Sequence, residues 1–592
     1  MATATIPLTK HKGGAFLIER TLPEEVFTPE DFTDEHRDIA RTTEDFWNKE
    51  VAPNLEPLQK HEPGLGVSLL RKSGELGLTG VFIPEKFGGM EMDLASMMIV
   101  AEGVAKDGSY AAWHGAQTGI GTLPVLLFGT EDQKKRYLPK LATAQMVASY
   151  CLTEAQAGSD AMAIRTRADL SPDGKYYTLN GQKMWITNGA DADLYTVFAK
   201  IDGEKFSCFL VERTFPGVQP GNEEQKMGIK GSSTTAVFLD NVKVPVENLL
   251  GEIGRGHIIA FNILNLGRLK LGPFCVGAAK DVLRLSLKYA KERHTFGKPI
   301  ASYGMIQHKL AEMAIKLYAS ECMSYRVVGL IQGQLEGFSW DQPDANKTML
   351  KAVEEFATEC SYIKLFATEA LDYIVDEGVQ IHGGNGYSQE YAVEHAYRDS
   401  RINRIFEGTN EINRMLATGM LLKRAMRGQL PLVAAVQKLL GEVLSGPTMS
   451  TSEGTEEDRL IENAKKIALF TTGIAYQKYL AALEEQQEIL GALTDIGMNV
   501  FAMESVLLRT RKLAEVKKSG EVARDMCTVF LHEAMELIES TARSVLATAS
   551  EGDALRMNLS ILKRFTKFDP VNAIALRRKI AERLLQADRY IV

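Results

Sequence analysis

A carboxylate between an aromatic residue and a glycine is the feature of this chain best suited to chemistry. Residues 398–412 form a basic run that ends in Phe406-Glu407-Gly408-Thr409-Asn410. After it, apolar residues recur at helical spacing, at Ile412, Met415, Leu416 and Met420. The stretch therefore predicts a loop that opens a helix, with Thr409 or Asn410 as the N-cap and Gly408 allowing close approach of the backbone.

Glu407 is then a lone carboxylate just outside a helix N-terminus. If it loses water there, its pKa rises, which suits a general base. A solvated loop glutamate is the alternative that this stretch alone leaves open.

Two segments further upstream could bind a cofactor. Residues 150–160 begin like a strand and reach the small-residue turn Ala157-Gly158-Ser159, whose amides and hydroxyl could hold a phosphate. Trp185 and Thr187 lie two apart on a predicted strand, so they share a face and could flank a flat heteroaromatic ring. An ordinary polar turn, and a core tryptophan beside a surface threonine, are the structural alternatives.

Two later segments have similar potential. Arg293 and Phe296 follow a predicted helix and offer a guanidinium fork for a pyrophosphate and an aromatic face. Residues 380–386 form a glycine-rich loop, but no strand precedes it and the G-x-G-x-x-G spacing is absent, so a Rossmann site is not indicated. A solvated helix-end arginine and a helix C-terminal cap are the alternatives.

The elements that must position these residues follow a distinctive order. Residues 1–31 form an N-terminal extension, and residues 32–147 have a helical pattern that includes a capping box from Thr130 to Gln133. Residues 148–251 are β-rich, with a hairpin predicted around Asn180-Gly181 and further strands at 194–199, 206–211 and 236–244. Residues 252–428 are helical again, and residues 429–592 add an all-α domain after a linker near 445–456.

Composition narrows the function classes. The chain has 592 residues, 45% of them hydrophobic and 24% charged, and a net charge of -8, which argues against nucleic-acid binding. The six cysteines are far apart with no C-x-x-C pair, so we expect reduced thiols and neither a metal site nor a disulfide framework. No apolar run of membrane-spanning length is present, and the first residues resemble neither a signal nor a transit peptide. We expect a cytoplasmic protein, peripheral at most to the inner face of a membrane, with a mitochondrial matrix location left open.

Five separated motifs together resemble the acyl-CoA dehydrogenase flavoprotein family. They are residues 84–89, 151–160, 183–189, 292–297 and 406–411, within a resemblance that covers residues 32–427. The stretch 262–268 and the added C-terminal domain resemble the very-long-chain branch. The resemblance implies a mainly α fold with a central β domain: an N-terminal helical domain, a β-barrel or sandwich domain, a C-terminal four-helix bundle and the extra all-α domain.

The resemblance also assigns residues. It implies that Glu407 is the catalytic base; some branches carry the base on the helix that here contains Arg268, but the preceding residue is Gly267, which has no carboxylate. FAD contacts are implied at Tyr150, Cys151, Leu152, Thr153, Ser159, Trp185, Ile186, Thr187, Arg293, Phe296, Gln380, Gly383, Gly384, Thr409, Asn410 and Glu411. Within this set, Arg293 and Phe296 are expected to reach FAD in a neighbouring subunit, which implies a homodimer. Acyl-CoA contacts are implied at Ser159, Asn265, Arg268 and Gly408. The chain departs from the family at Ala155-Gln156, where proline-glycine is frequent, and at Glu411, where glutamine is frequent.

The implied reaction is FAD-dependent α,β-dehydrogenation of a long-chain fatty acyl-CoA to the trans-2-enoyl-CoA in fatty-acid β-oxidation. Glu407 would remove the α-proton while the β-hydrogen leaves as hydride to flavin N5, and the electrons would pass to an electron-transfer flavoprotein. The alternatives are an acyl-CoA oxidase that uses oxygen, and a scaffold or assembly factor with a vestigial flavin site. The sequence leaves open the preferred chain length and the physiological acceptor.

The role of the C-terminal domain also stays open. Residues 561–592 are rich in Lys and Arg, interleaved with Leu562, Phe565, Phe568, Ile574 and Leu584. This pattern fits either a membrane-surface or partner-binding face, or a helix docked on the protein itself with a solvated basic side.

Overall fold

A computed structural model of the protein describes residues 10–444, 454–517 and 520–592. The N-terminal domain is helical, as predicted. Its main helices are α1 (Asp34–Phe46), α2 (Leu55–Gln59), α3 (Leu65–Glu75), α4 (Leu94–Gly103), α5 (Gly108–Ala116), α6 (Leu123–Phe128) and α7 (Glu131–Ala142). The capping box predicted at Thr130 is confirmed: its hydroxyl accepts from the amide of Gln133, and the Gln133 side chain accepts from the amide of Thr130.

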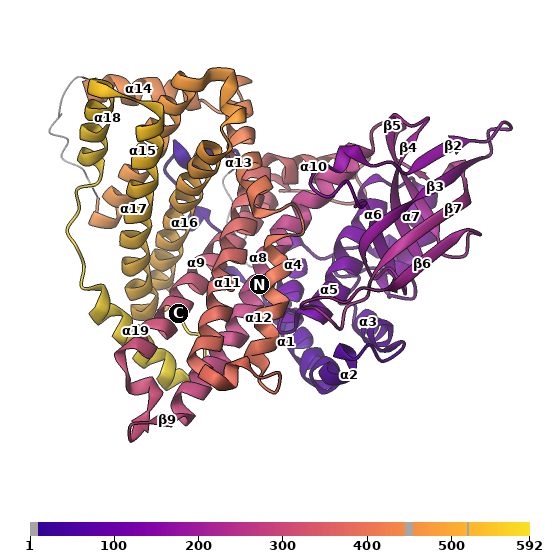
Figure 1. Cartoon of the computed structure of the whole chain (residues 1–592), viewed down its shortest axis with the longest axis horizontal. Helices are drawn as coiled ribbons and strands as arrows, with labels where there is room; N and C mark the ends of the chain where they lie inside the picture. Colours follow the sequence, from indigo (N-terminus) through magenta and orange to yellow (C-terminus); the bar gives the residue numbers. More distant parts are fainter. Residues whose placement is uncertain (1–9, 445–453, 518–519) are drawn as a thin grey trace.

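The β domain forms one sheet at the opposite side of the molecule from the C-terminal helices (Figure 1). Its strands are β1 (Ala148–Cys151), β2 (Arg167–Leu170), β3 (Tyr176–Thr187), β4 (Leu194–Ile201), β5 (Lys205–Glu212), β6 (Val218–Glu223), β7 (Thr234–Pro245) and β8 (Leu249–Leu250). They follow the order β6-β7-β3-β2-β4-β5-β8, with β1 parallel to β4. The strands predicted at 194–199, 206–211 and 236–244 are confirmed as parts of β4, β5 and β7.

The hairpin predicted at Asn180-Gly181 is wrong. Residues on both sides of this dipeptide belong to the single strand β3, which pairs with β7 along almost its whole length. Leu179 pairs with Val242 and Gly181 with Leu239, so the register shifts here as a β-bulge. The long ladder with β7 outweighs the local turn preference of Asn-Gly, and the extra residue is absorbed as a bulge.

The second helical region is a bundle beside the β domain. It contains α8 (Gly256–Glu292), α9 (Gly304–Gln334), α10 (Ala345–Glu355), α11 (Ala357–His382), α12 (Ala392–Ser400) and α13 (Asn410–Met426). Strands β9 (His294–Thr295) and β10 (Lys298–Pro299) form a short hairpin after α8, at the end of the bundle away from the β domain (Figure 1).

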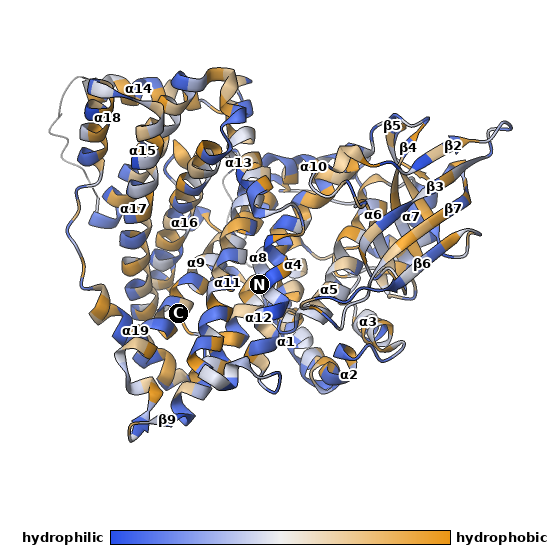
Figure 2. Ribbon diagram, viewed as in Figure 1, coloured by the Kyte–Doolittle hydropathy of each residue, from blue (hydrophilic) through white to orange (hydrophobic). Residues whose placement is uncertain are grey.

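The added C-terminal domain is all-α in the part that the structure describes. Its helices are α14 (Leu432–Leu444), α15 (Glu456–Tyr479), α16 (Gln487–Lys517), α17 (Glu521–Ala549), α18 (Gly552–Phe565) and α19 (Ala573–Ala587). Most of the predicted linker near 445–456 lies outside the described residues. Apolar and polar residues alternate along these helices in Figure 2. Helix α16 has the length and composition of a membrane span, but 83% of its apolar window is buried inside the protein, as expected of a core helix.

The N-terminal extension is integrated into the fold. Ala15, Phe16 and Leu17 are buried, and the ring of Phe16 packs edge-on against Tyr362 of the bundle and Phe501 of the C-terminal domain. Further along the extension, Arg509 of α16 binds Glu30 through two hydrogen bonds of 3.0 Å. We call residues 10–31 the N-terminal strap, because they join the bundle to the added domain.

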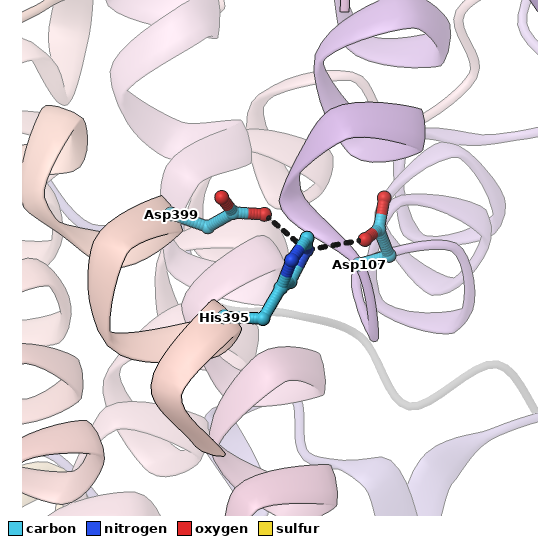
Figure 3. A group of neighbouring side chains, drawn as sticks. All are labelled: Asp107, His395 and Asp399. Carbon is cyan, nitrogen blue, oxygen red and sulfur yellow. Dashed lines mark hydrogen bonds and ion pairs between the residues drawn. The ribbon is translucent and has the colours of Figure 1, made fainter. Parts of the chain in front are cut away.

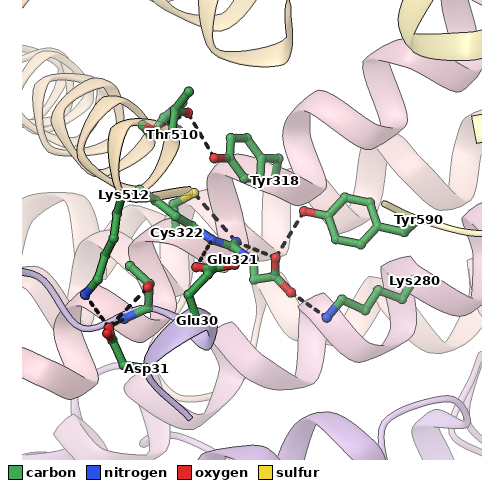
Figure 4. Close-up of polar contacts among 12 residues, drawn as sticks. Glu30, Asp31, Lys280, Tyr318, Glu321, Cys322, Thr510, Lys512 and Tyr590 are labelled. Carbon is green, nitrogen blue, oxygen red and sulfur yellow. Dashed lines mark hydrogen bonds and ion pairs between the residues drawn. The ribbon is translucent and has the colours of Figure 1, made fainter. Parts of the chain in front are cut away.

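The Arg509–Glu30 pair belongs to a larger buried group of charged residues from three parts of the chain (Figure 4). Arg509 also binds Glu321 of α9, whose carboxylate is held by Lys280 of α8 and accepts a hydrogen bond from Tyr590. These cations hold the pKa of Glu321 down at about 2 against the opposing effect of burial. We call this group the Arg509 cluster.

Helix α19 is docked on its own chain. Arg577 is buried and binds Glu312 of α9, while Ile580 and Leu584 lie in the core. Of the apolar residues noted in the sequence, Leu562 and Leu584 are buried and Phe565 and Phe568 pack against the core; Ile574 is 66% exposed. Most of the apolar face is therefore used within the protein.

Candidate active site

Glu407 lies in the loop before α13, as the sequence predicted. Thr409 is the N-cap: its hydroxyl accepts from the amide of Ile412 at 3.2 Å. Glu407 has φ of 57° and Gly408 of 81°, so two successive residues adopt the left-handed conformation. That conformation costs energy for a glutamate and persists because its surroundings fix it.

The carboxylate of Glu407 is enclosed and unpaired. Although the residue keeps some exposure, Oε2 is buried and has no hydrogen-bond partner among the described residues. Burial raises the pKa of Glu407 to about 7, and the nearby charges of Arg268, Lys364 and Lys270 limit that rise. A carboxylate with this pKa is poised to accept a proton near neutral pH.

The cations hold the main chain around Glu407. Arg268 donates from Nε to the carbonyl of Glu407 at 3.2 Å and from Nη1 to Asn265 at 2.9 Å. Lys364 of α11 donates to the carbonyl of Gly408 at 2.8 Å and to Asn410 at 2.6 Å. The loop is thus fixed from α8 and α11, which leaves the carboxylate itself free.

Gly267 of α8 faces this carboxylate. A Cβ at position 267 would lie 2.5 Å from Oε2 of Glu407, closer than real Cβ atoms approach. A side chain at position 267 would therefore displace the carboxylate of Glu407 from the place it has here, so the two positions considered for the base face each other.

Glu407 opens into a cavity of about 1090 Å³ between the N-terminal domain and the bundle. Its lining is mostly apolar and includes Met97, Leu123, Thr187, Ile263, Leu266 and Phe274. A general base in the wall of a mostly apolar cavity of this size can act on a carbon acid carried by a long apolar chain.

Comparison with known proteins agrees with this geometry. Family models for acyl-CoA dehydrogenases match four parts of the chain: the N-terminal domain at residues 33–145, the middle domain at 149–242, and C-terminal domains at 254–421 and 463–564. A probable acyl-CoA dehydrogenase of Bacillus subtilis is 48% identical over 585 residues, which cover 98% of each chain. The very long-chain specific acyl-CoA dehydrogenase of Rattus norvegicus is 35% identical over 83% of this chain and 77% of its own length.

Solved structures give the same result. The acyl-CoA dehydrogenase from Bacillus anthracis, solved in complex with FAD, matches with a TM-score of 0.97 at 49% identity and covers 98% of this chain and 100% of that one. The butyryl-CoA dehydrogenase of Megasphaera elsdenii is 35% identical with a TM-score of 0.60 and covers 66% of this chain and 99% of its own. The chain belongs to the acyl-CoA dehydrogenase family.

As an acyl-CoA dehydrogenase, the chain uses FAD, and the residues beside the cavity fit that cofactor. Trp185 is 56% exposed and has φ of 59°, because a second bulge in β3 lies between Lys183 and Ile186. Ile186 is buried, whereas Thr187 lines the cavity together with Glu407. An exposed indole beside a cavity-lining hydroxyl offers a flat face and a donor for the flavin ring.

The segment after β1 lies next to Trp185. The carbonyl of Thr153 accepts from the amide of Met184 at 2.9 Å, and Ser159 is exposed in its turn. Cys151 and Leu152 are buried, and Tyr150 is buried with its hydroxyl directed to the carbonyl of Ala260. Among the FAD contacts expected here, Thr153 and Ser159 have side chains free to bind, whereas Cys151 and Ile186 could contribute only main-chain groups.

A second set of expected FAD residues lies elsewhere. Arg293 is exposed and Phe296 is 96% exposed beside the β9–β10 hairpin, and Gln380, Gly383 and Gly384 are exposed at the C-terminal end of α11. Within one chain these residues are not brought to the Glu407 cavity. Their exposure is compatible with the expected contact across a subunit interface.

The remaining expected contacts surround the Glu407 loop. Glu411 is exposed, whereas Asn410 is buried and its side chain binds Lys364 and Glu369. Asn265 and Arg268 are buried, where Arg268 donates to the carbonyl of Glu407 and Asn265 accepts from Arg268.

A charged group at the cavity rim was not anticipated from the sequence (Figure 3). His395 of α12 lies between Asp107, the N-cap of α5, at 2.8 Å and Asp399 at 3.0 Å, and Asp399 also accepts from the amide of Ile229 in the β domain. Burial opposes the charge on His395, but its hydrogen bonds to both aspartates prevail and raise its pKa to about 10. The cluster therefore ties three domains together beside the cavity.

Sequence reasoning also missed Lys270 and Lys364. Both stand inside apolar runs, Leu269-Lys270-Leu271 and Ile363-Lys364-Leu365. A lysine in such a run is the signal that could have marked them, since an amine on a buried helix face needs a partner or a function.

Proposed function

We propose that this acyl-CoA dehydrogenase oxidises long-chain fatty acyl-CoA to trans-2-enoyl-CoA in fatty-acid β-oxidation. One observation carries the proposal: the buried, unpaired carboxylate oxygen of Glu407 in the wall of a cavity of about 1090 Å³. The size of the cavity and the 35% identity to very long-chain specific dehydrogenases support a long acyl chain.

Glu407 removes the α-proton of the thioester in this proposal. With a pKa raised to about 7, the carboxylate is ionised in a large fraction of molecules at neutral pH and is a stronger base than a solvated glutamate. The acyl chain completes the enclosure, because it displaces water from the apolar walls beside Glu407.

The thioester oxygen gains negative charge as the α-proton leaves, so it needs a donor. In the described part of the chain, the amide of Glu407 has no hydrogen-bond acceptor, and it lies next to the base. We assign this amide to the thioester oxygen. FAD, when bound beside Trp185 and Thr187, supplies the acceptor for the β-hydrogen.

We further propose that the enzyme works as a homodimer and passes its electrons to an electron-transfer flavoprotein. The exposed Arg293 and Phe296, away from their own chain's cavity, support a site completed by a second subunit. If oxygen were the acceptor instead, turnover without an added acceptor would release one hydrogen peroxide per enoyl-CoA.

The test is Glu407→Gln, which keeps the shape of the side chain and removes its basicity. We expect it to retain FAD and to lose at least about 1000-fold in the rate of flavin reduction by palmitoyl-CoA, since the α-proton then has no acceptor. Glu359→Gln is the matched control, because Glu359 is also a buried glutamate with a pKa raised to about 7 but lies outside the cavity. Flavin reduction at near-normal rate in Glu407→Gln would refute the proposal.

Chain length is tested separately. Turnover of unmodified enzyme across acyl-CoAs of graded length should be greatest for long chains. A preference for butyryl-CoA would contradict the long-chain part of the proposal and leave the role of Glu407 intact.

A further inference from the structure

Lys270 lies in the wall of the acyl cavity, one helical turn beyond Gly267 on α8. It is 4% exposed and lines the same cavity as Glu407. Its ammonium donates to the hydroxyl of Thr118 and lies 5.6 Å from the centre of the Phe274 ring. Burying an amine in the wall of a cavity for apolar chains costs free energy, because the amine loses its contacts with water.

The ammonium of Lys270 has no ion-pair partner in the part of the chain that the structure describes. Among the described residues, Thr118 is its one hydrogen-bond acceptor, and no carboxylate forms an ion pair with it. Nearby His114 is buried and stays neutral, because burial and the charge of Lys270 lower its pKa to about 3. Burial lowers the pKa of Lys270 itself to about 7, although the carboxylate of Glu407 favours its charged form.

Two other lysines near the cavity, Lys106 and Lys364, have partners for their ammonium groups. Lys106 also lines it, but its ammonium binds Glu44 at 2.6 Å and lies over the ring of Trp47. Lys364 uses its donors on Gly408 and Asn410. Lys230 also lines the cavity but is exposed to solvent, so among the described cavity-lining lysines Lys270 is the buried one that has no carboxylate partner.

The neighbourhood of Lys270 provides room for an acceptor. Thr118 and Gly119 belong to the irregular turn Gln117–Gly121 that follows α5, and turns of this π type occur often at functional sites. The hydroxyl of Thr118 gives its own proton to the carbonyl of His114 at 2.7 Å and so can only accept from Lys270. Gly119 lies beside the ammonium, since a Cβ added to this glycine would lie 3.8 Å from Nζ of Lys270.

We propose that Lys270 forms a subsite for an oxygen acceptor carried on the acyl chain beyond the reacting carbons, so that the enzyme favours acyl-CoAs with a hydroxyl, oxo or carboxylate group there. The inference rests on the proposed function, since it places an acyl chain in the cavity. An oxygen acceptor on the chain accepts from the remaining N–H groups of the ammonium, whereas a plain chain leaves Thr118 as its acceptor. A site built to hydrogen-bond a substrate group discriminates strongly against the analogue that lacks it.

The first test uses the unmodified enzyme with its FAD. The kcat/KM of adipoyl-CoA and ω-hydroxyhexanoyl-CoA is compared with that of hexanoyl-CoA, and suberoyl-CoA with octanoyl-CoA. We expect at least one oxygenated substrate of each length to exceed its plain counterpart by roughly tenfold, the effect of one hydrogen bond to a charged group. A kcat/KM for the plain chains equal to or greater than that for the oxygenated chains at both lengths would overturn the inference, while turnover of plain chains would still support the proposed function.

The second test replaces Lys270 by the apolar residue of similar length. Lys270→Met should lose the roughly tenfold preference and turn over the plain chain as well as, or better than, the unmodified enzyme. Lys270→Gln keeps a donor without charge and should retain preference for the hydroxyl substrate while losing that for the carboxylate. Lys106→Met is the matched control and should keep the preferences of the unmodified enzyme.

Two outcomes of the second test would overturn the inference. An equal fall in kcat/KM for plain and oxygenated chains in Lys270→Met, with a shifted pH profile, would mean that Lys270 acts on Glu407. A changed flavin absorption spectrum with unchanged substrate preference would mean that it acts on the cofactor.

Discussion

At the scale of single residues, the proposed chemistry depends on a glutamate that the protein surrounds with cations but does not pair. Arg268 and Lys364 bind carbonyls of the loop instead of the carboxylate of Glu407. An ion pair would have lowered the pKa of Glu407 and weakened it as a base. The main-chain contacts fix its position without this loss.

The first prediction concerns the pH dependence of the rate. Because burial raises the pKa of Glu407 to about 7, the ionised base increases as pH rises through 7, and the rate of flavin reduction should rise with it and level off above. Lys364→Met removes a cation that lowers this pKa, so the midpoint should move to higher pH. Stopped-flow reduction at saturating acyl-CoA measures both curves. A rate independent of pH between about 5.5 and 8 would contradict the assignment.

At the scale of elements, the residues proposed to face the flavin depend on a buried ion pair between β3 and the segment after β1. Lys183 is fully buried and binds Glu154 at 2.7 Å and the carbonyl of Leu152 at 3.1 Å. Glu154 also accepts from Thr166 and from the amide of Arg165. Lys183 thereby places Trp185 of its own strand beside Thr153.

The second prediction removes the cation of this pair. Lys183→Met leaves the buried carboxylate of Glu154 uncompensated and should lower the free energy of unfolding by about 3–5 kcal/mol, with loss of bound FAD. Lys205→Met, at an exposed pair with Asp202, should leave the unfolding midpoint nearly unchanged, because solvent already screens that pair. Denaturant unfolding followed by flavin and tryptophan fluorescence measures both variants. Equal stability of the two would show that the buried pair is dispensable.

Some of these features could be predicted from the sequence and others could not. The N-cap at Thr409 and the capping box at Thr130 were predictable because their hydrogen bonds are local. The bulge at Gly181 was not, because the partner that straightens β3 is β7, a strand that comes much later in the chain. The family motifs indicated Glu407, but its raised pKa and its closeness to Gly267 depend on the packing of α8 against the loop. The position of Lys270 in the cavity wall could not be predicted, because its hydrogen-bond partner Thr118 is 152 residues away in the sequence.

At the scale of the molecule, the Arg509 cluster joins the added domain to the rest. Arg509 is 2% exposed and contacts carboxylates of the N-terminal strap and of α9. The third prediction is that Arg509→Met destabilises the protein by about 3–5 kcal/mol, because Glu30 loses its partner while it remains buried. Hydrogen exchange should rise in the strap before it rises in the β domain.

The control for this variant lies two residues away on the same helix. Arg511 pairs with Asp458 at a partly exposed position, so Arg511→Met should cost less than about 1 kcal/mol and leave exchange in the strap unchanged. Uniform exchange across the whole chain in Arg509→Met would mean that the strap has no separate dependence on the cluster.

The strap also has a consequence for biosynthesis. Glu30 and Asp31 bind residues 479 and 481 positions later in the chain. At a ribosomal rate of about 5–20 residues per second, these early residues wait roughly half a minute or more before Arg509 and Lys512 emerge. Until then, the packing site for Phe16 and Leu17 is incomplete. Nascent chains therefore expose an apolar segment to which chaperones can bind. The N-terminal segment is buried only when the C-terminal domain, which is synthesised last, has folded.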